Sequence, residues 1–491
     1  MYRLFCGDIF KSGNLKKEWK RSCFLVFCGG EERMNYGVVI QQGPQDWQIF
    51  QHRDGKAQIH ISGCFSLPSS LPDQEKVRVY ARIVREDDGF TVIDWTPAQM
   101  TDHTFSLTLT DVPLGGLYRL ETCMPREGNG WSFEWAVRGD IRHHLGVGDL
   151  FVIAGQSNAK GFGREPAYDP PQLGVHLMRQ SGRWDLATHP LGDSTDILWP
   201  EAEDRSVTGY SPYLSFAKQL YRALGYPIGL IQTAKGASPL QQWAPKDGLL
   251  FEGMIKLIQN SGGSITGVLW DQGSSDAAEQ WSESYLTRFE EMVSALRRNL
   301  KSEVVFLTCQ LNRQLDGQDD LYWNRIRQAQ LDAAKKITGV FVVPTYDLGL
   351  SDNIHNSSAS VIRLGERLAQ VALSRIYRRG NCAIPYLSYM EVLDDHQIRL
   401  FFSNIFGGSV SLKWLSRSPE HLPLAVFSEQ KRITVSEFLV EREDQILLKT
   451  KEVLHGKIVV TVAEGVNPQG RPSYETRSII PVLAGSVWAD R

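Results

Sequence analysis

The sequence has few cysteines, no long apolar run and almost no net charge, and each of these absences excludes a class of protein. Its seven cysteines are odd in number, scattered over 491 residues and contain no Cys-x-x-Cys pair, so we expect neither a zinc site nor a disulfide framework. No stretch approaches the roughly 18 consecutive apolar residues of a membrane span. Lys plus Arg number 53 and Asp plus Glu 56, and this formal net charge of −3 argues against a bulk nucleic-acid binder.

The beginning of the chain shows no signal for secretion. Its only apolar run, residues 23–28, is too short for the hydrophobic region of a signal peptide. We therefore expect a soluble, cytoplasmic protein whose cysteines are free thiols in a reducing compartment. Residues 1–35 mix lysines and glycines without a clear period, and we interpret them as an irregular leader.

The length favours about three domains, because domains average roughly 150 residues. Residues 36–146 and residues 380–491 both contain short apolar or alternating runs separated by turns. This rhythm is typical of small all-β domains, so we predict a β-sandwich-like domain on the N-terminal side and a second β domain on the C-terminal side. The expected strands include residues 38–40, 57–62, 77–84, 105–109, 398–402, 424–427, 445–449 and 457–462.

Residues 147–379 change to an alternation of buried strands and amphipathic helices. Five apolar runs predict strands at residues 150–154, 228–233, 265–270, 304–309 and 340–344. Helices are expected at residues 211–224, 277–300, 321–337 and 359–377. Repeated βα units build a parallel sheet covered on both faces, so we predict an α/β fold: a three-layer α/β/α sandwich around five parallel strands. Ligands of such a sheet bind beyond the carboxyl ends of its strands.

The motif Gly155-Gln156-Ser157-Asn158 comes directly after the first of these strands. A serine at such a strand-to-helix turn is exposed at the active edge of the sheet, and its own N–H points to where an oxyanion would form. The motif is not the Gly-x-Ser-x-Gly elbow of α/β-hydrolases, because residue 159 is alanine. Taken alone, the serine is equally well explained as a turn residue that caps a helix.

The motif Asp352-Asn353-Ile354-His355 lies between the fifth strand and the last helix. A separation of three residues across a turn lets the carboxylate reach the Nδ1–H of the imidazole, which leaves Nε2 free as a general base. The alternative is a loop histidine followed by helix-capping residues, and the two interpretations are compatible. Asp347 is an alternative acid.

Two further loops follow predicted strands. After residues 228–233, the backbone N–H of Gly236 could approach a ligand. After residues 265–270, the amide of Gln272 could donate a second hydrogen bond. Each loop is also explained as a tight turn that needs glycine, but four such elements at strand ends point together to one site.

The Gly-Gln-Ser-Asn motif, the Trp-x-Gln-Gly block at Trp270 and the Asp-x-x-His pair together resemble the Ser-Gly-Asn-His (SGNH) hydrolases, in the branch of sialate O-acetylesterases and acetylxylan esterases. The resemblance covers residues 147–379, and the flanking β regions are similar to the accessory domains of longer sialate O-acetylesterases. Three positions depart from the family pattern: Ser274 stands where Glu is usual, Lys235-Gly236 where Gly-Gly is frequent, and Ala159 where Met is frequent. The missing Glu leaves open what holds the Gln272 loop.

The resemblance implies a serine esterase that needs no metal or organic cofactor. Ser157 would be the nucleophile, His355 the general base and then acid, and Asp352 the carboxylate that orients the histidine. The oxyanion hole would consist of the Ser157 N–H, the Gly236 N–H and the Gln272 side chain. Other side chains near these loops are candidates for sugar binding, with a place in the core as the alternative for the aromatic ones: Gln156, Asn158, Trp243, Trp270, Trp281 and Tyr322.

We therefore expect an O-acetylesterase that removes acetyl groups from sialic acid or another acetylated sugar through an acetyl-enzyme. A deacetylase of xylan or of another glycan is the alternative among enzymes. A non-catalytic carbohydrate-binding protein is the alternative of another class, favoured slightly by Ser274 and disfavoured by the complete triad. The expected partner is an acetylated sugar or oligosaccharide, not a nucleic acid or a membrane, and the sequence indicates no oligomeric state.

Overall fold

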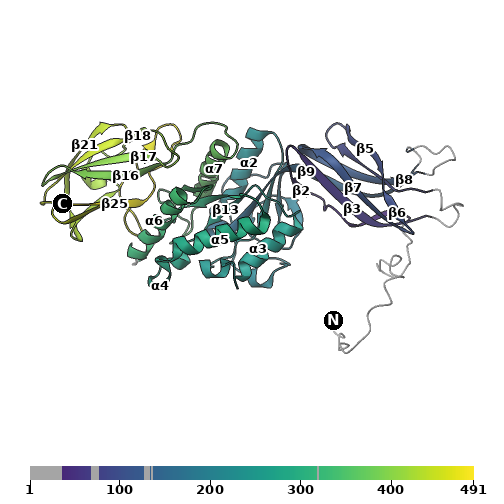
Figure 1. The fold of residues 1–491 in the computed structure, drawn as a ribbon, viewed down its shortest axis with the longest axis horizontal. Helices are drawn as coiled ribbons and strands as arrows, with labels where there is room; N and C mark the ends of the chain where they lie inside the picture. Colours follow the sequence, from purple (N-terminus) through teal and green to yellow (C-terminus); the bar gives the residue numbers. More distant parts are fainter. Residues whose placement is uncertain (1–35, 68–76, 126–132, 134–135, 318–319) are drawn as a thin grey trace, which may run out of the picture.

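The computed structural model describes residues 36–67, 77–125, 133, 136–317 and 320–491. These residues form an elongated molecule in which a mixed α/β region lies between two β regions (Figure 1). This is the mixed α/β fold with flanking β regions that the sequence predicts. The predicted leader, residues 1–35, lies outside the described residues.

The central sheet is larger than predicted. Its strand order is β11-β10-β12-β9-β13-β14-β15, and every strand except the antiparallel edge strand β11 runs parallel to its neighbours. The prediction of five parallel strands was therefore wrong by one, because it missed β10. A histidine interrupts its four residues, so it lacks the continuous apolar run by which the others were recognised. The bounds are β9 Val137–Gly155, β10 Val175–Met178, β11 Trp184–Leu186, β12 Ile228–Gln232, β13 Gly267–Asp271, β14 Val305–Cys309 and β15 Val340–Val343.

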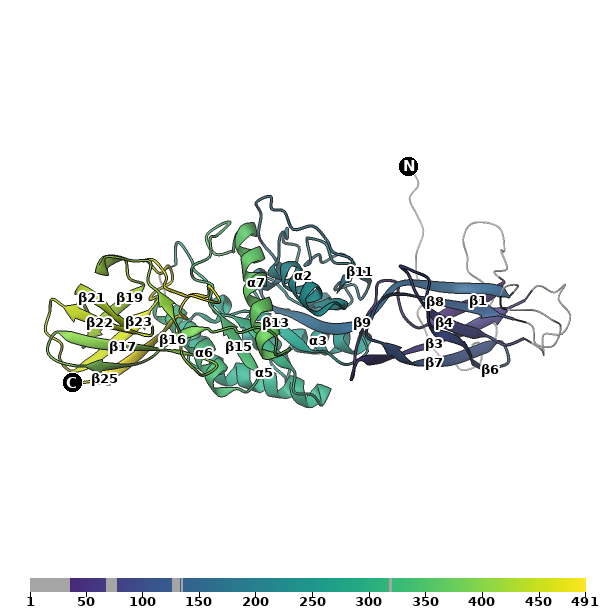
Figure 2. The same ribbon diagram turned by 90° about the horizontal axis from the view of Figure 1, so that it is seen from above.

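Helices cover both faces of this sheet (Figure 2). The side chains of β9 alternate between the faces, so that Phe151 and Ile153 join one core cluster while Leu150 and Val152 join the other. The first cluster is covered by α2 (Pro212–Leu224) and α7 (Ser358–Arg375). The second is covered by α3 (Leu249–Asn260), α5 (Tyr285–Leu300) and the apolar side of α6 (Asp320–Lys336).

The helix predicted over residues 277–300 is divided into two. A short helix α4 (Glu279–Ser282) precedes α5, and Ser284 lies at the junction. The hydroxyl of Ser284 donates a hydrogen bond to the carbonyl of Trp281. A serine side chain that bonds to the backbone in this way competes with the helical hydrogen bonds, so the chain turns here instead of continuing.

The N-terminal β region consists of two sheets with a shared apolar core. One has the order β1-β3-β7-β6, and the other joins β5, β4 and β8 to the first half of β9, with β2 parallel to β9. The strand β9 thus continues from this region into the central sheet, where it pairs with β12 and β13. The bounds are β1 Gly37–Gln42, β2 Ile49–Gln51, β3 Lys56–Ser66, β4 Tyr80–Arg85, β5 Thr91–Pro97, β6 Gln99–Thr101, β7 Thr104–Pro113 and β8 Gly115–Met124.

The C-terminal β region also has two main sheets, in the orders β16-β17-β22-β21 and β20-β19-β23-β25, around one core, besides the short pair β18 and β24. The buried guanidinium of Arg327 on α6 connects it to the centre, donating to the carbonyls of Leu311 and Asn312 at 2.8 and 2.6 Å and to that of Gly465 at 2.5 Å. The bounds are β16 Pro385–Val392, β17 Gln397–Asn404, β18 Leu412–Lys413, β19 Leu424–Ser428, β20 Lys431–Ile433, β21 Val435–Arg442, β22 Gln445–Thr450, β23 Lys457–Val462, β24 Tyr474–Glu475 and β25 Gly485–Asp490.

Two further features of the described residues bear on the opening analysis. None of their helices is both long enough and apolar enough to cross a membrane. Four cysteines fall among them, all buried and none in a disulfide: Cys64, Cys123, Cys309 and Cys382. The other three, Cys6, Cys23 and Cys28, lie in the part of the chain that the structure does not describe.

The buried carboxylate of Asp149 connects the N-terminal region to the central sheet. It accepts hydrogen bonds from Gln51 of β2 at 2.9 Å and from Thr266 before β13 at 2.5 Å. The hydroxyls of Tyr226 and Tyr377 donate to its other oxygen at 2.9 and 2.7 Å. Burial alone would raise the pKa of this carboxyl, but the hydrogen bonds from His52, Thr266, Gln51 and Tyr377 outweigh that effect and hold the pKa well below its usual value.

We predict that Asp149→Asn lowers the free energy of unfolding by about 2–4 kcal/mol at pH 7, because an amide replaces an ionised acceptor of several buried donors. A depressed native pKa stabilises the fold above the unfolded pKa of about 4 and loses that effect as the pH falls below it. Urea unfolding at pH 7 and pH 3 should therefore show a difference from wild type that shrinks in acid. Glu303→Gln, at a side chain 88% exposed, is the control, and an equal difference at both pH values would contradict the prediction.

Candidate active site

The turn after β9 places Ser157 at the carboxyl edge of the sheet. Gly155 has a φ of +122°, and a Cβ at this position would lie 2.2 Å from the carbonyl oxygen of Asp271. The next N–H, of Gln156, donates to that same oxygen at 2.9 Å. Only glycine fits so close an approach in this conformation, and Ser157 then begins the short helix α1 (Ser157–Lys160).

The three predicted catalytic side chains lie together. The hydroxyl of Ser157 is 2.9 Å from Nε2 of His355, and Nδ1 of His355 is 2.8 Å from Oδ2 of Asp352. An ionised carboxylate can only accept, so the ring proton belongs on Nδ1 and Nε2 is left to accept from Ser157. The ring of Phe162 stacks on the imidazole with the centroids 4.4 Å apart. This arrangement can activate the serine as a nucleophile.

Asp352 is ionised and fixed. Its Oδ1 accepts the backbone N–H groups of Ile354 and His355 at 3.0 and 2.9 Å. Partial burial would raise the pKa of this carboxyl, but these bonds and the one from the His355 ring hold the pKa below its usual value. The alternative acid, Asp347, is instead paired with the buried Arg367 and accepts from Tyr474 at 3.3 Å.

Asn158 holds the histidine loop instead of lining the cleft. Its Oδ1 accepts the N–H of Asn356 at 3.0 Å, and its side chain is buried. Asn312, just beyond the end of β14, donates to the carbonyl of Ile354 at 2.5 Å and to Asn356 at 3.3 Å. The prediction that Asn158 binds substrate is therefore corrected to a positioning contact, because both ends of its amide face the loop.

Gln156 holds the loop that follows β13. Its side-chain oxygen accepts the N–H of Gly273 at 3.0 Å and lies 3.5 Å from the N–H of Ser275, while its amide nitrogen donates to the hydroxyl of Ser274. The loop that lacks the family's glutamate is thus held by a hydrogen bond to Ser274. Gln156 also lines the wall of the cleft, so it remains a candidate substrate contact.

The amide of Gln272 faces away from the cleft, contrary to its predicted place in an oxyanion hole. Its nitrogen donates to the carboxylate of Asp276 at 2.6 Å and to the carbonyl of Ser238 at 3.2 Å. Asp276 is fully buried and also accepts from Leu240 and Arg288, both at 2.8 Å. Two acceptors already take both amide protons of Gln272, and its side chain is buried, so it offers no donor to a ligand.

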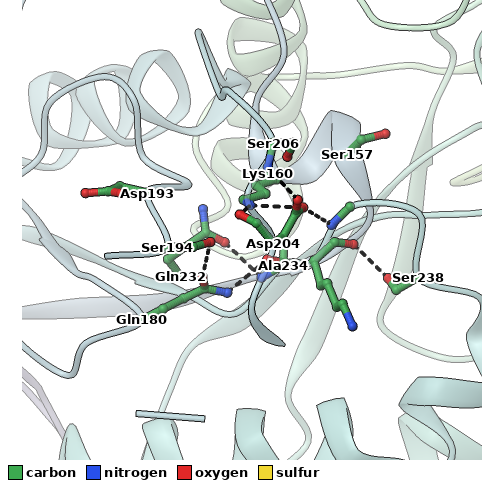
Figure 3. Close-up of polar contacts among 12 residues, drawn as sticks. Ser157, Lys160, Gln180, Asp193, Ser194, Asp204, Ser206, Gln232, Ala234 and Ser238 are labelled. Carbon is green, nitrogen blue, oxygen red and sulfur yellow. Dashed lines mark hydrogen bonds and ion pairs between the residues drawn. The ribbon is translucent and has the colours of Figure 1, made fainter. Parts of the chain in front are cut away.

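The N–H of Gly236 also has a partner that the sequence does not suggest. It donates to Oδ2 of Asp204 at 2.9 Å, and the ammonium group of the fully buried Lys160 lies 2.9 Å from the same oxygen (Figure 3). Because Asp204 accepts this N–H, Gly236 is not free to serve as the predicted oxyanion donor in this structure. The neighbouring Ala237 has a φ of +54°, and its N–H has no hydrogen-bond partner among the described residues.

Two of the four predicted sugar-stacking rings, Trp243 and Trp270, are in the core, whereas Trp281 and Tyr322 are half-buried and do not line the cleft. Trp243 and Trp270 are 0% and 1% exposed and pack edge to face, and the indole N–H of Trp243 donates to Ser238 at 3.0 Å. Neither ring reaches the surface, because each completes the apolar cluster beneath the sheet edge. The rings that line the cleft are instead Phe162 and Trp323.

The cleft at the triad has a volume of about 500 Å³. Its lining includes Ser157, His355, Asp204, Ser206, Ala237 and Gln314. Asn312 could have been found from the sequence, because it follows the carboxyl end of the fourth predicted strand as Gln272 follows the third. Asp204 could not, since it lies in a long irregular segment between β11 and α2. Among the described residues, no three His, Cys, Asp or Glu side chains converge to hold a metal ion.

The central region of the chain is similar to known carbohydrate esterases. Residues 147–374 match the family model described as "Carbohydrate esterase, sialic acid-specific acetylesterase". A probable carbohydrate esterase of Arabidopsis thaliana is 29% identical over 261 residues, which cover 48% of this chain and 94% of that protein. The sialate O-acetylesterase of Homo sapiens is 27% identical over 173 residues, 27% of this chain but only 32% of the relative.

One solved structure shares the fold over most of the chain. A carbohydrate acetylesterase from Xanthomonas citri aligns with 91% of this chain and 99% of its own, at a TM-score of 0.59 and 18% identity. The likeness therefore extends past the central region into the flanking β regions. At this identity it supports the fold alone.

We predict that Ser157 reacts with a fluorophosphonate probe, because His355 can take its proton. His355→Ala should slow labelling by about 10²-fold or more, the scale of positioned general-base catalysis. Ser275→Ala is the matched control, since this serine lines the same cleft but has no histidine beside it. Peptide mapping by mass spectrometry gives the labelled residue, and equal labelling of Ser157→Ala and wild type would contradict the prediction.

Proposed function

We propose that the protein is a serine O-acetylesterase acting on an acetylated sugar, because its central region, residues 147–374, matches the family of sialic acid-specific acetylesterases. The observation that carries the proposal is the chain of two hydrogen bonds from Ser157 through His355 to Asp352, at 2.9 and 2.8 Å. The named relatives are carbohydrate or sialate esterases, which supports an acetyl sugar as the substrate.

The reaction would proceed through an acetyl-enzyme. As Oγ of Ser157 attacks the acetyl carbonyl carbon, its proton passes to Nε2 of His355, and Asp352 stabilises the imidazolium that forms. His355 then gives this proton to the sugar oxygen as the ester bond breaks. A water molecule, deprotonated by the same nitrogen, attacks the acetyl carbonyl, and the collapse of the second intermediate returns the proton to Ser157 and releases acetate.

The oxyanion would be stabilised by backbone N–H groups. The N–H of Ser157 is at the start of α1, where no earlier helical turn supplies an acceptor. The N–H of Ala237 belongs to the loop after β12, and Ala237 lines the cleft. We propose these two donors, because the Gly236 N–H and the Gln272 amide are bonded to Asp204 and Asp276. The positive φ of Ala237 fits such a role, since strained backbone is often kept at functional sites.

Ser274 no longer favours the alternative of a non-catalytic carbohydrate-binding protein. Ser274 raised the question of whether the Gln272 loop is held at all. In the structure Gln156, Asp276 and Gln330 each hydrogen-bond to this loop, Gln330 to the carbonyl of Gln272 at 2.9 Å. The glutamate is therefore dispensable for the position of the loop, and the complete triad argues for an enzyme.

We predict acetate release from 4-nitrophenyl acetate and from O-acetylated sugars, both sialic acid and xylo-oligosaccharides. Ser157→Ala should lower kcat by about 10³-fold or more, because the covalent route is lost. Asp352→Asn should lower it by about 10²- to 10⁴-fold, because the histidine loses the partner that fixes its tautomer.

Enzymatic detection of acetate measures these rates, with Asp316→Asn as the control. Asp316 also lies near the histidine loop and accepts a hydrogen bond from Asn353, but it does not contact His355. Activity unchanged in Ser157→Ala would exclude the proposed nucleophile. No acetate from any ester with folded protein would instead favour the carbohydrate-binding alternative.

A further inference from the structure

One carboxylate lines the cleft that holds the reacting serine, and it forms an ion pair with a buried lysine. Asp204 lines the cleft together with Ser157, and its side chain remains 15% exposed. Lys160 and the N–H of Gly236 are each 2.9 Å from its Oδ2, and the N–H of Ser206 donates to its Oδ1 at 3.0 Å. Three partners from three segments hold this carboxylate in place, so it cannot turn away from a substrate.

Asp204 is also ionised. Its partial burial would raise the pKa of the carboxyl, but the hydrogen bonds from Ser206 and Lys160 outweigh this effect and hold the pKa well below its usual value. Because its side chain remains 15% exposed in the cleft, the carboxylate can accept a hydroxyl of a substrate in a charge-assisted hydrogen bond.

The described lining of the cleft presents no lysine or arginine to a negatively charged substrate. The ammonium group of Lys160 is 0% exposed and already paired with Asp204, so it cannot contact a ligand. Lys235 donates to the carbonyl of Glu201 at 2.8 Å, and Arg205 pairs with Glu203 at the surface. Proteins that bind carboxylates usually present an arginine or lysine to them.

The other lining groups suit an uncharged polyol. Ser206, Ser275 and Gln314 offer neutral hydrogen-bonding groups to sugar hydroxyls. Phe162 and Trp323 border the cleft, but their rings are only 7% and 3% exposed, so they offer little surface for stacking.

We infer that the alcohol half of the substrate is a neutral acetylated sugar, and that Asp204 both binds one of its hydroxyls and disfavours sugars that carry a carboxylate, such as sialic acid. This inference rests on the proposed esterase function and chooses between the two substrate classes that the family leaves open. It does not follow from the family description, which names sialic acid.

The test compares substrates that differ only in charge. One pair is the methyl glycoside of a mono-O-acetylated glucose and that of the equally acetylated glucuronic acid. The other is O-acetylated N-acetylneuraminic acid and its methyl ester, with acetate release as the readout. The neutral member of each pair should have a kcat/KM at least about tenfold higher in low salt, and the ratio should shrink in about 0.5 M NaCl because salt screens the repulsion.

The variant Asp204→Asn tests whether this residue causes the preference for neutral over anionic substrates. It should lower activity on both members of a pair, since Asp204 also holds Gly236, but it should reduce the neutral-to-anionic ratio at least about threefold. Glu203→Gln removes a neighbouring negative charge that does not line the cleft, and it should leave the ratio unchanged. Thermal unfolding establishes that each variant is folded.

The outcomes separate this inference from the proposed function. A wild-type preference for the anionic member, or a ratio that neither salt nor Asp204→Asn changes, would overturn the inference while leaving the esterase intact. If no member of either pair and no aryl acetate is cleaved in a Ser157-dependent way, the esterase proposal itself fails. A preference for the neutral member that Asp204→Asn reduces supports both.

Discussion

The geometry of the site depends on how β9 ends between β12 and β13. Gly155 pairs in register with Asp271, and Ile153 pairs with Gln232, so the loops that follow all three strands start at the same edge of the sheet. The close approach of Gly155 to the carbonyl of Asp271 then turns the chain toward α1. Because the strands are central and buried, this edge has little freedom to move, and Ser157 is held where residues 198 positions later can reach it.

Amide side chains hold the loops at this edge to one another. Gln156 accepts a hydrogen bond from the loop after β13, and Asn158 accepts one from the histidine loop. The two neighbours of Ser157 in the motif thus hold both of these loops in place. Asn312 adds a second bond to the histidine loop. Amide groups suit this task because each can donate and accept at once, and buried polar groups that are paired cost little.

Charged groups have two roles in this structure: some join the β regions to the central sheet, and one borders the cleft. Asp149 and Arg327 are buried and join the central sheet to the N-terminal and C-terminal β regions through hydrogen bonds to several segments. Asp204 is different, because it is anchored by Lys160 on the nucleophile's own helix yet still borders the cleft. This ion pair thereby couples the position of α1 to the loop at Gly236.

The sequence by itself determined the mixed α/β fold with flanking β regions, the places of five of the parallel strands, and the three side chains, Ser157, His355 and Asp352, that lie together in the site. These signals are local: apolar runs of strand length, helical periodicity, and a serine or an Asp-x-x-His pair directly after a strand. Only the tertiary structure decided which donors face the cleft. It gave the Gln272 amide to Asp276, the Gly236 N–H to Asp204 and the rings of Trp243 and Trp270 to the core. The physical reason is that a donor bonds to whichever acceptor the folded chain places beside it, and a ring packs wherever the core has room for it. Asp204, for example, comes from residues 187–211, a segment that carries no periodic pattern of its own.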